Sequence, residues 1–148
     1  VDAQQTIELY EELRKRCSPD VYTYSTMLAL YARNSMLQEA QQLFSEMIES
    51  KVQPNVIVYS TLINAHIKVK DLDGALQVQE QMITEGITPN EFTQTCIFTG
   101  ILVIRRNPGY VLEQLRKYEA QNIPIAPGVM EAIFKGFLQR KTADLTIE

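Results

Sequence analysis

The stretch PNVIVYSTLINA at residues 54–65 has a close counterpart in PDVYTYSTMLAL at residues 19–30. The two stretches belong to a longer match, in which residues 19–53 align without gaps to residues 54–88 and ten of 35 positions are identical. Four prolines follow the same 35-residue period: Pro19, Pro54, Pro89 and Pro124. A fixed period of this length is typical of a repeat protein whose units pack against their neighbours.

Each unit is predicted to form two helices joined by a short turn. In the first unit, Tyr24, Met27, Leu28 and Tyr31 recur at the spacing of one helix face, and residues 37–48 hold a second such stripe. A residue suited to begin a helix stands before each expected first helix: Asp20, Asn55 and Asn90. One helical hairpin cannot bury both of its apolar faces, so the units are expected to stack, with no β-sheet.

Two strings resemble the pentatricopeptide repeat family of the P type, which has 35-residue units. They are the opening at residues 54–65 and AQQLFSEMIES at residues 40–50. The chain has no Trp, so it lacks the Trp-Leu-Gly-Tyr pattern of the 34-residue tetratricopeptide repeat. The resemblance implies an all-α fold of helix-turn-helix units stacked into a right-handed α-solenoid.

The units divide the chain unevenly. Two units are clean, and the third is degenerate, since Gln94 replaces the repeated Tyr and the turn at residues 105–109 has one extra residue. From Pro127 a last helix is expected to begin, with its core from Met130 to about Leu138, followed by a polar tail. The expected divisions are 1–20 (end of a preceding unit), 21–55, 56–90, 91–126 and 127–148 (partial unit and tail). Because the chain opens within a unit, we expect it to be part of a longer protein.

The resemblance implies that the first helices line a groove for single-stranded RNA, with one base read by each unit. In the family, the fifth and last residues of a unit read the base, which here gives Ser25 with Asn55 and Ser60 with Asn90. The family pattern links such pairs to adenine. An alternative from the residues alone is that the serines are ordinary polar residues and the asparagines are only helix caps.

The third unit is expected to read a base poorly. Thr95 takes the place of the serine, and its partner is Ile125 or Ala126, depending on where the extra residue is placed. Neither of these side chains can form a hydrogen bond to a base.

Two further sets of residues follow from the resemblance. The second residue of each unit stacks on bases, although packing between units is an equal alternative: Tyr22, Ile57 and Phe92. Cations near the end of each first helix contact phosphate, although the helix dipole alone would also favour them there: Arg33, Lys68, Lys70, Arg105 and Arg106. Val103 is expected at the place of Lys68 in the third unit.

The net charge of −4 argues against indiscriminate RNA binding, but it is unevenly distributed. The expected first-helix segments are residues 21–35, 56–70, 91–106 and 127–141. They hold eight Lys or Arg and two Glu, a net charge of +6 that leaves −10 for the remaining residues. A basic stripe on an acidic body is a better footprint for RNA than the total suggests.

No pattern typical of an enzyme, cofactor or metal site occurs in the sequence. His66 stands at the place of Tyr31 in the helical stripe, which predicts a packing role. Cys17 and Cys96 have no second cysteine nearby, so a zinc knuckle is excluded. No stretch has the roughly 18 apolar residues that a membrane span requires.

The sequence therefore predicts a single-stranded RNA-binding module without catalytic activity. The resemblance implies that the protein acts in a mitochondrion or chloroplast, in RNA processing, stability or translation. The targeting segment is expected to be absent from this chain. The alternative is a protein-interaction scaffold within an organellar ribosome or another ribonucleoprotein. A third option is a catalytic RNA-processing domain that lies outside this chain.

Overall fold

The computed structural model describes residues 2–145, with side chains described for residues 2–139. This part of the chain is all-helical and contains no strand, which confirms the predicted fold class. The elements are α1 (Ala3–Arg14), α2 (Val21–Arg33), α3 (Leu37–Glu49), α4 (Val56–Lys68), α5 (Leu72–Thr84), α6 (Glu91–Gly100), η1 (Ile101–Arg105), α7 (Pro108–Ala120) and α8 (Pro127–Leu145). The side chains of Arg140 and Lys141, and all of residues 146–148, lie outside the described part.

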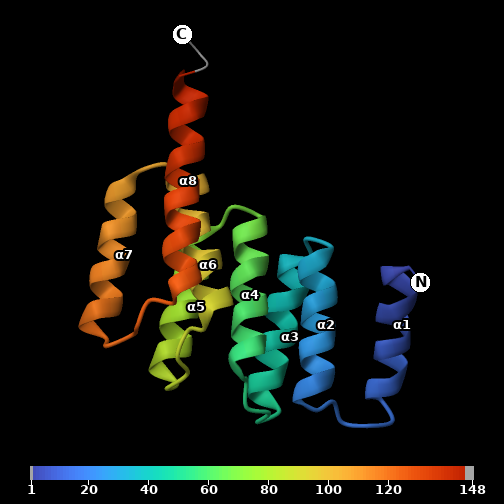
Figure 1. Cartoon of the computed structure of the whole chain (residues 1–148). Coiled ribbons are helices and arrows are strands. Elements are labelled where there is room, and N and C mark those ends of the chain that lie inside the picture. The colour runs from blue at the N-terminus through green and yellow to red at the C-terminus, as the bar shows by residue number, and fades with distance from the viewer. Residues whose placement is uncertain (1, 146–148) are drawn as a thin grey trace.

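The helices form two layers. The first helices of successive units pack on one another, α2 on α4, α4 on α6 and α6 on α8, and they make one continuous layer. The second helices, α3, α5 and α7, lie against the first helices of their own units. Figure 1 shows the helices side by side, from α1 at the right to α7 at the left, with α8 rising to the C-terminus. A ligand that follows the first-helix layer would therefore meet the units in chain order.

The core repeats with the sequence. Leu28, Ile63 and Phe98 occupy the same position in three successive first helices, and all three are fully buried. Met47 and Met82 do the same in the second helices. A fully buried side chain of this size stabilises the fold by about 1.5–3 kcal/mol. The stacking of units thus buries the apolar stripes that one hairpin would leave exposed.

The third unit accommodates its extra residue within its first helix. The residues with positive φ after the first helices are Ser35, Lys70 and Arg106, so the spacing is 35 residues and then 36. The π-helix η1 lies at the end of the first helix of this unit and leads into Arg106 and the expected turn. A π-turn is the geometry by which a helix takes up one additional residue. Counted back from Arg106, Ile104 rather than Val103 stands at the place of Lys68.

The last helix begins at Pro127 as expected, but its expected end was wrong. Instead of ending near Leu138, α8 continues to Leu145. Proline fits the first turn of a helix, where its missing N–H is not needed. The residues after Leu138 are mostly good helix formers, and a helix can continue without an apolar stripe. No described helix combines the length and the hydropathy that crossing a membrane requires.

Candidate nucleic-acid interface

An aspartate or asparagine side chain begins each of the first helices α2, α4 and α6. Asp20 Oδ1 accepts a hydrogen bond from the backbone N–H of Thr23 at 2.9 Å. Asn55 Oδ1 accepts from Val58 N at 3.0 Å, and Asn90 Oδ1 accepts from Thr93 N at 2.9 Å. An unsatisfied N–H at a helix start requires an acceptor, so the amide oxygen must face the helix.

The cap leaves the other half of each asparagine amide available. Within the described residues, the Nδ2 atoms of Asn55 and Asn90 have no hydrogen-bond partner. Each Nδ2 carries two N–H donors. Capping and base reading would therefore use different atoms of the same side chain, and the two interpretations of these asparagines do not exclude each other.

The two serines differ in exposure. Ser25 Oγ donates to Val21 O at 2.7 Å, and Ser60 Oγ lies 2.6 Å from Val56 O in the equivalent place. Ser25 is partly exposed, but only 4% of Ser60 is exposed. Ser25 is therefore partly accessible, with its hydroxyl proton donated to Val21 O, whereas Ser60 is covered by the neighbouring unit.

The third unit has no reading pair of the same kind. Ala126 directly precedes α8, as Asn90 directly precedes α6, so Ala126 rather than Ile125 takes the place of Asn90 in the third unit, where Thr95 is partly exposed. Ala126 has no side chain that can cap a helix. Gln94 Oε1 instead accepts a hydrogen bond from the backbone N–H of Ala126 at 3.0 Å.

Gln94 is a structural residue whose role the sequence did not reveal. It is buried at the place of Tyr24 and Tyr59, and its Nε2 donates to Pro124 O at 2.9 Å and to Pro89 O at 3.2 Å. One amide thereby joins the loops on both sides of the third unit. The substitution of the repeated tyrosine was its only signal in the sequence.

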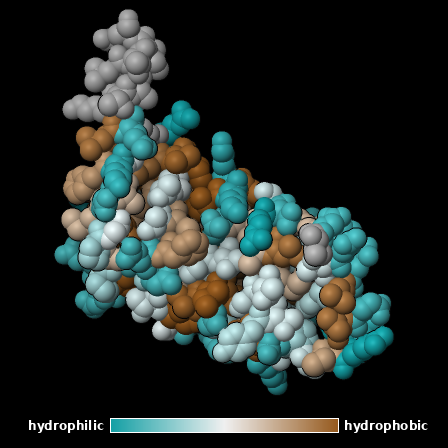
Figure 2. Space-filling view, turned by 45° about the vertical axis from the view of Figure 1, so that its right-hand side comes forward, coloured by the Kyte–Doolittle hydropathy of each residue, from teal (hydrophilic) through white to brown (hydrophobic). Residues whose placement is uncertain are grey.

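The three candidate stacking residues are exposed on the first-helix layer. The exposed fractions are 76% for Tyr22, 58% for Ile57 and 53% for Phe92. Packing between units would have buried these side chains, so packing does not explain them. Figure 2 shows that apolar side chains on the visible face form separate areas among polar ones. Apolar side chains spaced in this way can each contact the face of one base.

The candidate phosphate residues separate into two kinds. Four are exposed and have no ion pair within residues 2–139: Arg33, Lys68, Lys70 and Arg106. Arg105 differs, since it pairs with Asp73 of α5 and lies 5.6 Å from the ring centre of Tyr110. The geometry thus directs Arg105 towards the second helices.

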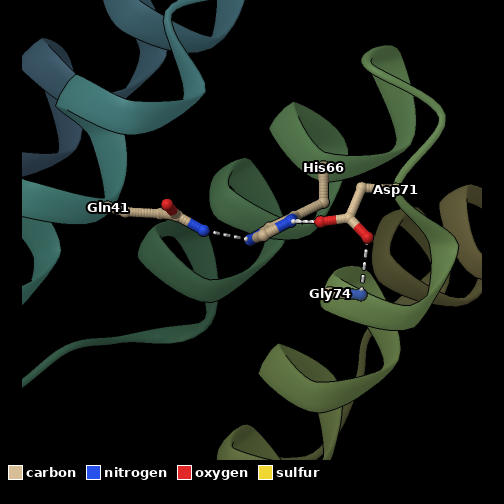
Figure 3. Close-up of polar contacts among 4 residues, drawn as sticks. All are labelled: Gln41, His66, Asp71 and Gly74. Carbon is tan, nitrogen blue, oxygen red and sulfur yellow. Dashed lines mark hydrogen bonds and ion pairs between the residues drawn. The ribbon is translucent and has the colours of Figure 1, made fainter.

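His66 lies in the protein interior, as the sequence predicted, with 3% of its surface exposed. Figure 3 shows its ring between Gln41 and Asp71, 3.5 Å from Gln41 Nε2 and 2.9 Å from Asp71 Oδ2. Asp71 Oδ1 also accepts from Gly74 N at 3.1 Å and caps α5. The Gly74 N–H bond, and then the His66 bond, lower the pKa of Asp71. These contacts join α3, α4 and α5, and no group of three or more His, Cys, Asp or Glu suited to a metal occurs in the described part.

Comparison with known proteins gives one sequence family. The sequence model of the PPR repeat family matches residues 19–68 and residues 54–102, which together cover more than half of the 148 residues. A chloroplastic pentatricopeptide repeat-containing protein of Arabidopsis thaliana is 35% identical over 43 residues, which is 29% of this chain and 5% of that protein. The chain therefore spans only a small part of this curated relative.

Solved structures of this family share the fold. The chain is similar to the crystal structure of the pentatricopeptide repeat protein PPR10 in complex with an 18-nt psaJ RNA element, with a TM-score of 0.79, 20% identity and coverage of 94% of this chain and 20% of that one. It is also similar to the PPR domain of Arabidopsis thaliana protein-only RNase P 1 in complex with tRNA. There the TM-score is 0.75 at 21% identity, over 97% of this chain and 76% of that one. The predicted α-solenoid is thus confirmed.

Proposed function

Because the chain belongs to the pentatricopeptide repeat family, we propose that its first-helix layer binds single-stranded RNA, one base per unit, without catalysing a reaction on it. The observation that best supports this function is the exposure of Tyr22, Ile57 and Phe92 at one repeated position, where packing gives no reason for apolar side chains. The structures of PPR10 with an RNA element and of the RNase P domain with tRNA add support from related folds. Thr95 and Ala126 contribute little to reading.

The adenine preference has a physical basis in the cap geometry. With Oδ1 bonded to the helix, Asn55 and Asn90 present N–H donors to a base. Adenine N1 and cytosine N3 are unprotonated acceptors at the centre of the Watson–Crick edge, whereas guanine and uracil have an N–H there. The cap geometry therefore disfavours guanine and uracil, and the choice of adenine over cytosine rests on the family pattern. The two pairs would thus favour two consecutive adenines, read 5′ to 3′ along the chain.

The test replaces both asparagines by aspartate. In the Asn55→Asp, Asn90→Asp variant, one carboxylate oxygen still caps the helix and the other accepts from the base instead of donating to it. Preference should shift from adenine towards guanine by about 1–3 kcal/mol per base, the usual range for a good bidentate base contact. Binding is compared on single-stranded oligonucleotides that differ only at the two bases, with melting temperature as the folding control.

The possible outcomes separate the assignments. If the unchanged chain binds RNA and the variant keeps the same base preference, the asparagines serve only as caps. If neither protein binds single-stranded RNA at low salt, a protein-interaction scaffold becomes the better proposal. An exposed apolar stripe on α8, Met130, Phe134 and Leu138, favours that second function.

Organellar action in transcript processing, stability or translation is a proposal for the whole protein. It is supported by the chloroplastic relative, which is matched over a short segment, and the choice between chloroplast and mitochondrion stays open.

A further inference from the structure

The two proposed reading pairs, Ser25/Asn55 and Ser60/Asn90, have the same residue types but differ in one neighbouring side chain. Thr93, the third residue of its unit, contacts both Ser60 and Asn90, and the residue at the same repeat position for Ser25 and Asn55 is Val58. Both side chains are fully buried. They have the same shape and differ in one hydroxyl, so the second pair has a hydrogen-bonding group that the first pair lacks.

The hydroxyl of Thr93 connects the two members of its pair. Thr93 Oγ1 lies 2.6 Å from Ser60 Oγ and 2.8 Å from Asn90 Oδ1. Asn90 Oδ1 also accepts from Thr93 N at 2.9 Å, so two donors of one residue converge on this oxygen. Asn55 Oδ1 accepts only the backbone N–H of Val58.

Counting protons shows the consequence for each side chain. Two hydroxyl protons serve three contacts, so when Thr93 Oγ1 donates to Asn90 Oδ1, the one hydroxyl proton of Ser60 goes to Thr93 Oγ1 inside the protein. Ser60 therefore has no proton to offer to RNA, and its burial hides the oxygen as well. The base facing the second pair would be read by Asn90 Nδ2 alone.

The same bonds oppose rotation of the amide. A base with an N–H at the centre of its Watson–Crick edge, guanine or uracil, could be accepted only if the amide turned its oxygen outward. That turn breaks one cap bond at Asn55 and two bonds at Asn90. It would also place N–H donors against the helix N–H groups.

We propose that Thr93 is a positioning residue that fixes the Asn90 amide with its nitrogen towards the RNA groove. The second pair then rejects guanine and uracil more strongly than the first pair, although both are Ser/Asn pairs. Thr93 is buried and does not touch the base, so it acts through Asn90. This inference rests on the proposed RNA-binding function and adds a specificity determinant outside the two reading positions.

The experiment exchanges the hydroxyl between the two units. Thr93→Val gives the second pair the surroundings of the first, Val58→Thr does the reverse, and Thr93→Ser retains the hydroxyl. Each variant of the 148-residue chain is titrated with single-stranded RNA oligonucleotides in constant flanks. These oligonucleotides carry A, C, G or U at the position expected to face each pair.

In Thr93→Val one hydrogen bond is lost. The ratio of affinity for adenine to affinity for guanine at the second base should therefore fall about fivefold. The ratio at the first base should not change, and Thr93→Ser should keep the original ratio. Val58→Thr should raise the ratio at the first base by a similar factor.

A matched control separates reading from capping. Thr23 makes the same bonds to Asp20 that Thr93 makes to Asn90, with Thr23 Oγ1 2.9 Å from Asp20 Oδ1. Thr23→Val therefore removes an equivalent cap bond away from both reading pairs, and it should lower stability without changing either ratio.

The results distinguish this inference from the function on which it rests. Binding with unchanged ratios in Thr93→Val and Val58→Thr would overturn the role of Thr93 and leave RNA binding intact. An equal loss of affinity for all four bases would show that Thr93 only stabilises α6, which also overturns it. If the unchanged chain binds none of the oligonucleotides, both proposals fail together.

Discussion

Glycine at position 74 is required by the side chains of Asp71 and His66 and not by the backbone of α5. A Cβ on Gly74 would clash with Asp71 Oδ2 and with His66 Nδ1. Alanine in a helix is normally about 1 kcal/mol more favourable than glycine. Here we expect Gly74→Ala to destabilise the protein by about 1–3 kcal/mol, the usual cost of overpacking a core, as measured by urea unfolding.

The control is the same change in a His66→Ala background, where the ring is absent. The cost of Gly74→Ala should then fall sharply or reverse, and the double-mutant cycle gives the coupling between the two positions. An equal cost in both backgrounds would show that Asp71 or the helix itself resists the new methyl group.

At the residue scale, the sequence predicted the helix caps better than the side-chain contacts between residues far apart in the chain. The caps at Asn55 and Asn90 follow from local pattern, because a helix start needs an acceptor at a fixed offset. The bridge from Thr93 to Ser60 and the clamp from Gln94 to Pro124 were not predicted. The first joins residues of different units, and the second joins the two ends of the third unit. Alignment of one unit with the next gives no information about such contacts.

Among the elements, η1 is the one that departs from the repeat, and its role can be tested by deletion. Removing Val103, which is exposed, would return the third unit to 35 residues and convert the π-turn to a regular α-helix. We expect the free energy of unfolding to change by less than about 1 kcal/mol, since only a surface residue and a weak helical turn are lost.

The matched control for that deletion lies in a regular helix. Deleting Asn64 from α4 would rotate the following residues by about 100° and carry His66 out of the core. That variant should be strongly destabilised or unfolded by circular dichroism. If the two deletions cost the same, η1 is not the site of the extra residue.

Helix starts were easier to predict than helix ends. Caps and prolines mark the starts of α2, α4 and α6 in the sequence, and Gly86, with φ of 80°, marks the end of α5. The end of α8 was misplaced because periodicity reports only a buried face. A helix that continues into polar residues gives no such signal.

Across the whole molecule, the first-helix segments hold more Lys and Arg than Asp and Glu, in a sequence whose net charge is −4. Lys70 and Arg106 occupy equivalent places after α4 and η1, both at positive φ, 61° and 54°. This backbone region favours glycine, as at Gly86, so neither cation is placed there for stability. Ser35 occupies the same place after α2 at a φ of 56° and carries no charge, so positive φ alone does not mark a phosphate site. We expect Lys70 and Arg106 to contact phosphate because both are exposed and have no ion pair within residues 2–139.

Lys70→Gly and Arg106→Gly should therefore separate stability from binding. Each should raise the melting temperature, because glycine relieves the strain. Each should also make the slope of log affinity against log salt shallower by about 0.7, the value for one phosphate contact on single-stranded RNA. Slopes are measured by fluorescence anisotropy between low and moderate salt, on one oligonucleotide.

Arg105→Gln is the comparison, because Arg105 is adjacent in sequence but already pairs with Asp73 and lies over Tyr110. It removes the same charge, yet it should leave the slope nearly unchanged and lower stability slightly, as expected for an exposed ion pair. A loss of slope in Arg105→Gln equal to that in Arg106→Gly would mean that total charge attracts the RNA. A loss confined to Lys70 and Arg106 would mean that these two places, repeated from unit to unit, meet successive phosphates along the strand.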